Sequence, residues 1–278
     1  MKIKLNMIGG GFQHDICSSA LNTPKNVIWT KDKSSSISIH IDNSILLPVD
    51  PSKLNFGWFA ESSAIIPNVI EKVKTSIDEY KFKFKYIFTH DQRIIDLDPS
   101  FFKFTYPNAL PWVQNKKIFK KTKKISSITS NKLVTQGHIF RNKVINNFDN
   151  SVIEKFGRGT PNELPWTIRE NGLDESGKIV ALKDFEYSFA FENDNYEHIF
   201  CEKITDCFAT GTIPIYWGTP SIGNFFNING IIKYDENFKL ENLTSDLYET
   251  KKPYVLENFE KIIDLPTAED YIYLNYLK

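Results

Sequence analysis

The chain has 278 residues, of which 41% are hydrophobic and 24% are charged. A chain of this length can bury one large core or two smaller ones, and two domains are the natural expectation. The 34 lysines and arginines balance the 34 aspartates and glutamates, so the net charge gives no reason to expect nucleic acid or an acidic membrane as the main partner. Any anionic ligand must then be bound by a local group of residues.

The cysteines and the hydropathy of the chain indicate in which cellular compartment the protein is expected. Cys17, Cys201 and Cys207 show no CxxC spacing, which suits a reducing compartment and argues against a disulfide framework or a structural zinc. No run of about 18 apolar residues predicts a transmembrane helix, and the N-terminal apolar run is too short for a signal peptide. We therefore expect a cytoplasmic protein without an integral membrane segment.

The first part of the chain predicts an α/β domain. Ile3–Ile8 reads as a first strand that ends in Gly9-Gly10-Gly11, where a tight turn is favoured over a dinucleotide site because the spacing is not GxGxxG. Lys81–Thr89 alternates polar and apolar residues like a half-buried strand. The basic run Lys116–Lys124 indicates an exposed linker between two domains rather than a nucleic-acid site.

Glu61 is the first candidate functional residue. It directly follows a short aromatic strand, Phe56–Phe59, and precedes a helix expected from about Pro67 to Tyr80. A carboxylate between an aromatic strand and a loop of small residues can be partly desolvated, which would raise its pKa toward the range of a general base. Taken alone, a glutamate that helps to cap the helix is the favoured interpretation.

The second part of the chain predicts a further α/β domain. A strand that begins at Lys124 is followed by a helical pattern over Lys132–Phe148. Two apolar strands, Tyr187–Phe191 and Thr212–Trp217, enclose a polar loop and a helix that opens near His198. In open parallel sheets, ligands bind at the carboxyl ends of the strands and against helix N-termini. We therefore expect the loop between these two strands to carry the chemistry.

Polar residues gather around this unit. Arg141 lies on the first turns of the earlier helix, from where it could hold a phosphate bidentately. The loop and the second helix supply Glu192, Asn193, Glu202 and Lys203. Taken alone, Arg141 would be a surface arginine and Glu202-Lys203 an exposed helix pair. Glu192 fits the role of a buried hydrogen-bond acceptor as well as it fits a functional role.

These residues belong to a longer, ordered pattern. FAFEN at Phe189–Asn193, EK at Glu202-Lys203 and TIPIYWGTPS at Thr212–Ser221 resemble the donor-binding signature of the α-1,3/1,4-fucosyltransferases of glycosyltransferase family 10. Further matches in that family's order are Trp58–Ser63 (WFAESS), Ser130-Asn131, Arg141 and Phe156–Gly159 (FGRG). The resemblance covers the second domain well and the first domain only at WFAESS.

The resemblance implies a fold and a reaction. The fold would be α/β of the GT-B type, in which two Rossmann-like domains face each other across a cleft. Residues 1–121 would form the acceptor-side domain, and residues 122–278 would bind the nucleotide sugar. The reaction would be an inverting transfer of fucose from GDP-fucose to a hydroxyl of a glycan acceptor, with no bound cofactor, no divalent metal and no nucleic acid. A cytoplasmic enzyme of bacterial or viral type, acting on a surface glycan precursor such as a lipopolysaccharide, fits this pattern.

The resemblance also implies a role for each candidate residue. Glu61 would take the proton of the acceptor hydroxyl. Lys203 and Arg141 would neutralise the diphosphate as it leaves, in place of a metal ion. Glu202 would accept hydrogen bonds from the ribose hydroxyls, and Asn193 would orient the donor.

Two positions depart from the family pattern. Ile199 and Cys201 stand where the family usually has a tyrosine and a threonine. A missing tyrosine removes a stacking or hydrogen-bonding surface. The specificity for fucose and guanine is therefore less firmly predicted than the class of reaction. The alternatives are a transferase of another nucleotide-activated sugar and a carbohydrate-binding protein that keeps the fold without turnover.

Overall fold

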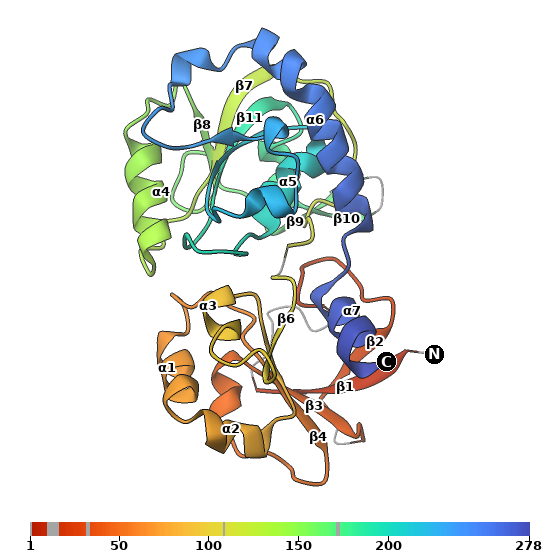
Figure 1. Cartoon of the computed structure of the whole chain (residues 1–278). Coiled ribbons are helices and arrows are strands. Elements are labelled where there is room, and N and C mark those ends of the chain that lie inside the picture. The colour runs from red at the N-terminus through yellow and green to blue at the C-terminus, as the bar shows by residue number, and fades with distance from the viewer. Residues whose placement is uncertain (1, 10–16, 32–33, 108, 171–172) are drawn as a thin grey trace. The chain divides into compact units, whose positions relative to one another are not determined.

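Two parallel β-sheets form the framework of the chain in the computed structural model, which describes residues 2–9, 17–31, 34–107, 109–170 and 173–278. Unit 1 comprises Met1–Asn108 and Pro266–Lys278, and unit 2 comprises Ala109–Leu265 (Figure 1). Each unit holds one of the sheets. The predicted α/β class is confirmed, whereas most of the glycine turn after the first strand lies outside the described residues.

The sheet of unit 1 has six strands, and every neighbouring pair is parallel. In spatial order they are β2 (Val27–Thr30), β1 (Ile3–Ile8), β3 (Ile37–Ile41), β4 (Leu54–Trp58), β5 (Ile87–Thr89) and β6 (Phe102–Phe104). The carboxyl ends of parallel strands meet at one edge of the sheet. The loops after β3 and β4 therefore emerge side by side.

Two apolar clusters cover the two faces of this sheet. One contains residues of α1 (Pro67–Thr75), α2 (Ile77–Lys83) and α3 (Gln92–Ile95), and the other contains residues of α7 (Ala268–Ile272). Neighbouring residues of β5 belong to different clusters, Ile87 to the first and Phe88 to the second. Because successive side chains of a strand point to opposite faces, the clusters lie on opposite sides of the sheet.

The predicted strand Lys81–Thr89 is wrong over its first half. Residues up to Lys83 belong to α2, and only Ile87–Thr89 form β5. Tyr80 and Phe84 are one helical turn apart, and their rings stack with centroids 6.3 Å apart in the core. This contact between side chains four residues apart stabilises a helical turn. The short alternating pattern therefore does not form a strand.

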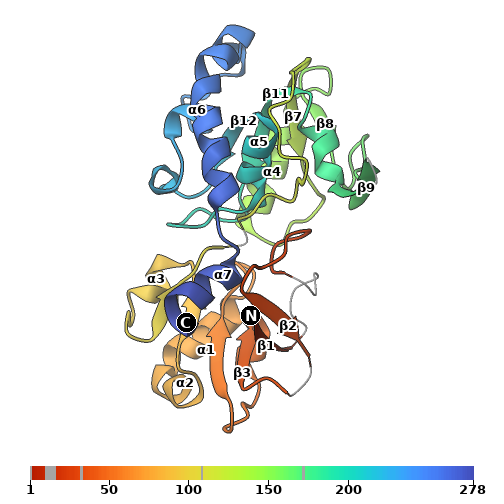
Figure 2. The same cartoon turned by 90° about the vertical axis from the view of Figure 1, so that its right-hand side faces the viewer.

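The C-terminal segment returns to unit 1, in contrast to the expected second domain of residues 122–278. Ala268 and Ile272 of α7 lie in the same apolar cluster as the first strands, and Figures 1 and 2 show the blue α7 beside the red and orange strands. The buried Glu269 carboxylate accepts hydrogen bonds from the Ser18 hydroxyl at 2.9 Å and the Trp29 indole at 3.0 Å. These long-range contacts fix the segment.

Unit 2 begins at residue 109, earlier than the expected boundary at 122, because the chain before β7 packs on this unit. The Lys117 amide donates to the Ala209 carbonyl at 2.9 Å. The Lys121 ammonium donates to the Thr210 carbonyl at 2.7 Å and to the Thr212 hydroxyl at 2.9 Å. The basic run is therefore part of unit 2 and not an exposed linker.

The sheet of unit 2 has five parallel strands. In spatial order they are β13 (Ile232–Lys233), β12 (Ile213–Trp217), β11 (Phe185–Phe191), β7 (Lys123–Ile128) and β8 (Glu154–Phe156). The helices are α4 (Gln136–Asn146), α5 (Glu202–Thr210) and α6 (Ser245–Asp264), and β9 (Thr167–Glu170) pairs with β10 (Leu173–Ser176) as a separate hairpin. The strand order reverses at β7, so β7 and β11 form the topological switch point.

None of the helices in the described ranges is long and apolar enough to cross a membrane.

We expect the substitution Glu269→Ala to lower the free energy of unfolding by about 2–4 kcal/mol, because buried donors on Ser18 and Trp29 would lose their acceptor. Urea denaturation followed by circular dichroism measures the change. Glu71→Ala removes an exposed carboxylate that pairs with Lys74 at 3.7 Å, and it should change stability by at most about 0.5 kcal/mol. Equal effects of the two substitutions would contradict a central role for Glu269.

Candidate active site

The switch point of unit 2 brings two helices to the carboxyl end of β11. Helix α4 follows β7, and the segment from Glu192 to Lys203 follows β11 into the first turn of α5. Gly137 in the first turn of α4 lies so close to Asn193 that an added Cβ would overlap the Asn193 carbonyl group. A glycine is needed there, because any side chain would push α4 away from the end of the strand.

Arg141 projects from α4 toward this strand end. Its side chain is buried, with 4% of the residue exposed, and one terminal nitrogen lies 3.5 Å from the Phe191 carbonyl oxygen. Its Nε–H has no hydrogen-bond partner within the described part of the chain. Burial lowers the pKa of Arg141, but an arginine stays charged at neutral pH. A buried guanidinium with a donor to spare is suited to an anionic ligand.

Lys203 lies on the first turn of α5 and faces the buried carboxylate of Glu192. The two groups are 3.5 Å apart, and the Lys203 ammonium also lies 2.8 Å from Cys201 Sγ. The Cys201 amide and thiol donate to the two Glu192 oxygens at 3.0 and 2.7 Å. Burial opposes the charge on Lys203, but contacts with Cys201, Glu202 and Glu192 outweigh it and raise the pKa of Lys203. Lys203 is therefore a fixed cation.

Glu202 precedes Lys203 at the start of the same helix. Its carboxylate lies 2.8 Å from the ammonium of Lys178 and 3.9 Å from that of Lys203. Burial opposes the charge of Glu202, but Lys178 and then Lys203 outweigh it and hold the pKa of this carboxyl well below its usual range. Glu202 is thus an ionised acceptor beside two cations.

His138 lies near these charged groups but is itself neutral at neutral pH. It forms a capping box with Thr135 at the start of α4. Burial, together with the positive charges of Arg141 and Lys203, lowers the pKa of His138 to about 4. At neutral pH Arg141 and Lys203 therefore carry a positive charge and His138 does not.

Glu61 lies in unit 1, in the loop after β4, with an exposed side chain. The sequence allows Glu61 to be a partly desolvated carboxylate. In the structure the desolvated carboxylate is instead that of Asp42, which directly follows β3. Asp42 Oδ1 accepts hydrogen bonds from the Ala60 and Glu61 amides at 2.8 and 3.1 Å. Burial raises the pKa of Asp42 to about 7, against the lowering effect of these amides. The Ser63 hydroxyl donates to Asp91, so carboxylates after β3 and β5 hold the Glu61 loop.

The structure thus gathers four of the five predicted residues in unit 2: Arg141, Asn193, Glu202 and Lys203. It also shows two supporting residues that sequence reasoning missed, Lys178 and Asp42. Asp42 directly follows the apolar residues of β3, and a carboxylate after such a run is a usable signal. Lys178 lies in a segment without a motif, and no sequence signal points to it.

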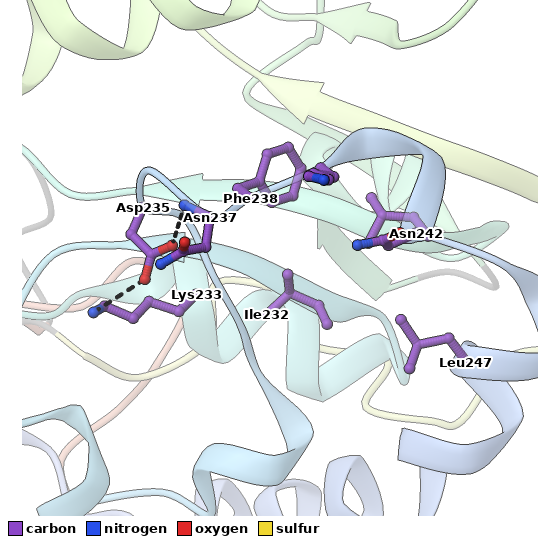
Figure 3. A pocket seen from close by; sticks show the side chains of 9 residues that line it. Ile232, Lys233, Asp235, Asn237, Phe238, Asn242 and Leu247 are labelled. Atoms are coloured by element: carbon purple, nitrogen blue, oxygen red, sulfur yellow. Dashed lines mark hydrogen bonds and ion pairs between the residues drawn. The ribbon is translucent and has the colours of Figure 1, made fainter.

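A separate pocket of about 270 Å³ lies on unit 2 around β13 (Figure 3). Its lining includes Lys233, Asp235 and Phe238, and the Lys233 ammonium pairs with Asp235 at 3.2 Å. None of the predicted functional residues lines it. The candidate active site is therefore the charged cluster at the end of β11 and not this pocket.

Among the described residues, no group of three or more His, Cys, Asp or Glu side chains is arranged to hold a metal ion. The expected independence from divalent metals stays a prediction.

Each unit thus holds a parallel sheet, and Arg141 and Lys203 lie at the switch point of the sheet in unit 2. Solved structures confirm the GT-B type fold. An α-glucosyltransferase solved with UDP-glucose and DNA has a TM-score of 0.51 at 11% identity and covers 97% of this chain and 86% of that one. TarM of S. aureus, solved with UDP, has a TM-score of 0.51 at 13% identity, over 86% of this chain and 55% of that one.

The sequence resemblance to fucosyltransferases is also confirmed. The chain is 29% identical over 108 residues to the α-(1,3)-fucosyltransferase FucT of Helicobacter pylori, which is 37% of this chain and 22% of that protein. An α1,3-fucosyltransferase solved with GDP-fucose superposes with a TM-score of 0.49 at 12% identity, over 95% of this chain and 82% of that one. No protein-family model matches the chain.

We expect Asp42→Asn to alter the pH dependence of stability. As the pH falls through about 7, native Asp42 takes up a proton, whereas the unfolded chain does so only near 3.8. The free energy of unfolding of the wild type relative to the variant should therefore rise by about 1–2 kcal/mol from pH 8 to pH 5.5. Urea denaturation at both pH values measures it, and asparagine keeps an acceptor for the two amides. Parallel pH profiles would show that Asp42 titrates near its ordinary pKa.

Proposed function

We propose that the chain is an inverting glycosyltransferase that transfers fucose from GDP-fucose to a hydroxyl of a glycan acceptor. One observation carries the proposal: two cations, the buried Arg141 and Lys203, lie at the switch point of unit 2 beside the first turn of α5. Strand ends at a switch point and helix N-termini are where α/β folds bind phosphates. The local similarity to H. pylori FucT supports fucose as the sugar.

The donor would bind to unit 2. Arg141 and Lys203 would hold the two phosphates and stabilise the negative charge that develops when the bond between fucose and the diphosphate breaks. The Glu202 carboxylate would accept hydrogen bonds from the ribose hydroxyls. Asn193, two residues after the end of β11, would orient the sugar. The two cations would supply the positive charge that a metal ion provides elsewhere, so transfer would proceed without a divalent metal.

The acceptor would bind to unit 1. Glu61 would take the proton of the acceptor hydroxyl while that oxygen attacks the anomeric carbon of fucose and GDP leaves from the opposite side. The two amides that bind Asp42 fix the backbone of Ala60 and Glu61, and the side chain of Glu61 is exposed. A precursor of a surface glycan is the acceptor class that we propose.

A cytoplasmic location is part of the proposal. All three cysteines are free thiols, Cys17 and Cys207 buried and Cys201 partly exposed. Free thiols in this number suit a reducing compartment.

We expect Lys203→Ala to weaken GDP binding and to reduce fucose transfer about 10²–10³-fold, because one of the two phosphate-binding cations is lost. Thermal unfolding with GDP, GDP-fucose, GDP-mannose and UDP-sugars measures donor binding, since a ligand at 100 times its Kd stabilises the native state by about 2.7 kcal/mol. Selective stabilisation by GDP and GDP-fucose is the expected result, in buffer with EDTA as well as without it.

The control for this experiment is Lys143→Ala, which removes an exposed lysine of α4, the helix that carries Arg141. It should leave binding and transfer unchanged. A response to UDP-sugars alone would replace fucose by another donor sugar. Glycan binding that survives Lys203→Ala, in a wild type without transfer, would favour the carbohydrate-binding alternative.

We expect Glu61→Gln to lower the transfer rate about 10²–10⁴-fold, because glutamine cannot accept the proton of the acceptor hydroxyl. The affinity for GDP should stay unchanged, since the proposed donor contacts lie in unit 2. Initial rates at saturating donor, together with a GDP titration, separate the two effects. Glu71→Gln on the exposed face of α1 is the matched control. Full activity of Glu61→Gln would assign this glutamate to the loop structure alone.

A further inference from the structure

A largely buried lysine without an assigned role lies beside the candidate donor site. Lys178 belongs to a short 3-10 helix, Gly177–Ala181, and its side chain is 15% exposed. Its ammonium donates to Glu202 Oε1 at 2.8 Å and to Asp206 Oδ2 at 3.1 Å. Glu202 and Asp206 lie one turn apart on α5, so one cation bridges the first turn of that helix.

Besides Glu202 and Asp206, Lys178 contacts a third side chain, that of Trp112. Its ammonium lies 4.0 Å from the centroid of the Trp112 ring, within the range of a cation–π contact. The Trp112 and Val113 amides donate to Asp206 Oδ1 at 2.7 and 2.9 Å. The lysine, the carboxylate and the indole therefore form one packed group with little freedom to rearrange.

The distances show which cation controls Glu202. Lys178 makes a hydrogen-bonded ion pair with the Glu202 carboxylate, whereas Lys203 stays 3.9 Å away. Without Lys178, the buried Glu202 would have to draw Lys203 closer to compensate its charge. Lys203 would then be turned away from an incoming phosphate.

We propose that Lys178 is a positioning residue of the donor site: it holds the Glu202 carboxylate toward the ribose hydroxyls of a nucleoside diphosphate and leaves Lys203 to the phosphates. The inference rests on the proposed function, because it assumes a nucleotide donor at the end of β11. A purely structural ion pair would affect stability alone. A positioning residue also affects how well the site recognises the ribose.

The test compares the affinities of GDP and 2′,3′-dideoxy-GDP by calorimetry. The wild type should bind GDP at least about tenfold more tightly, because hydrogen bonds to a carboxylate are lost with the hydroxyls. In Lys178→Met the affinity for both nucleotides should fall, because Lys203 is drawn away from the phosphates, and the affinity for GDP should fall about tenfold more than that for the dideoxy nucleotide. The preference for GDP would then nearly disappear.

Two variants act as controls. Lys121→Met removes another buried lysine of unit 2, whose ammonium donates to the Thr210 carbonyl and the Thr212 hydroxyl and has no contact with Glu202. It should lower the melting temperature and keep the preference for GDP. Lys178→Arg retains the charge and should restore most of the preference. If Lys178→Met does not fold, Lys178→Gln is measured in the same way.

Each outcome decides a different point. A preference for GDP that survives in Lys178→Met or Lys178→Gln overturns the positioning role and leaves the proposed function intact. A wild type that binds both nucleotides equally shows that Glu202 does not contact the ribose, which overturns the inference while the phosphate site stands. A wild type that binds neither nucleotide contradicts the proposed function itself.

Discussion

The charges at the end of β11 form the constraint on which the rest of unit 2 depends. Burying Arg141 and Lys203 is costly unless acidic groups compensate their charges, and Glu192 and Glu202 provide that compensation. The two cations are therefore balanced by acidic groups of the protein itself. A diphosphate would offer a second source of negative charge.

Helix α5 connects several parts of unit 2. Its first turn carries Glu202 and Lys203, and Asp206 one turn later binds the amides of Trp112 and Val113. The Thr205 hydroxyl donates to the Ala109 carbonyl at 2.6 Å. The chain that enters unit 2 is thus attached to the same helix that carries the proposed donor contacts, which explains why residues 109–122 pack here and are not an exposed linker.

Local patterns predicted the parts of the site that depend on local structure. The strand predicted at 187–191 lies within β11, the strand predicted at 212–217 corresponds to β12, and Arg141 lies on a helix. The parts that were missed depend on contacts between distant residues. Lys178 meets Glu202 only after a separate segment folds back onto α5, and Glu269 meets Trp29 across most of the chain. No periodicity or spacing encodes such pairs.

The two departures from the fucosyltransferase pattern have different physical consequences. Cys201 keeps the hydrogen bonding that a hydroxyl would provide, since its thiol donates to Glu192 at 2.7 Å and lies 2.8 Å from the Lys203 ammonium. Ile199 is 5% exposed and offers no side-chain donor or acceptor, although its carbonyl lies 3.4 Å from the Tyr216 hydroxyl. The thiol of Cys201 thus contacts both Glu192 and Lys203. Ile199 leaves its position without the stacking or hydrogen-bonding surface that a tyrosine would offer, so we expect any difference in donor selectivity from the fucosyltransferases to originate at Ile199 rather than at Cys201.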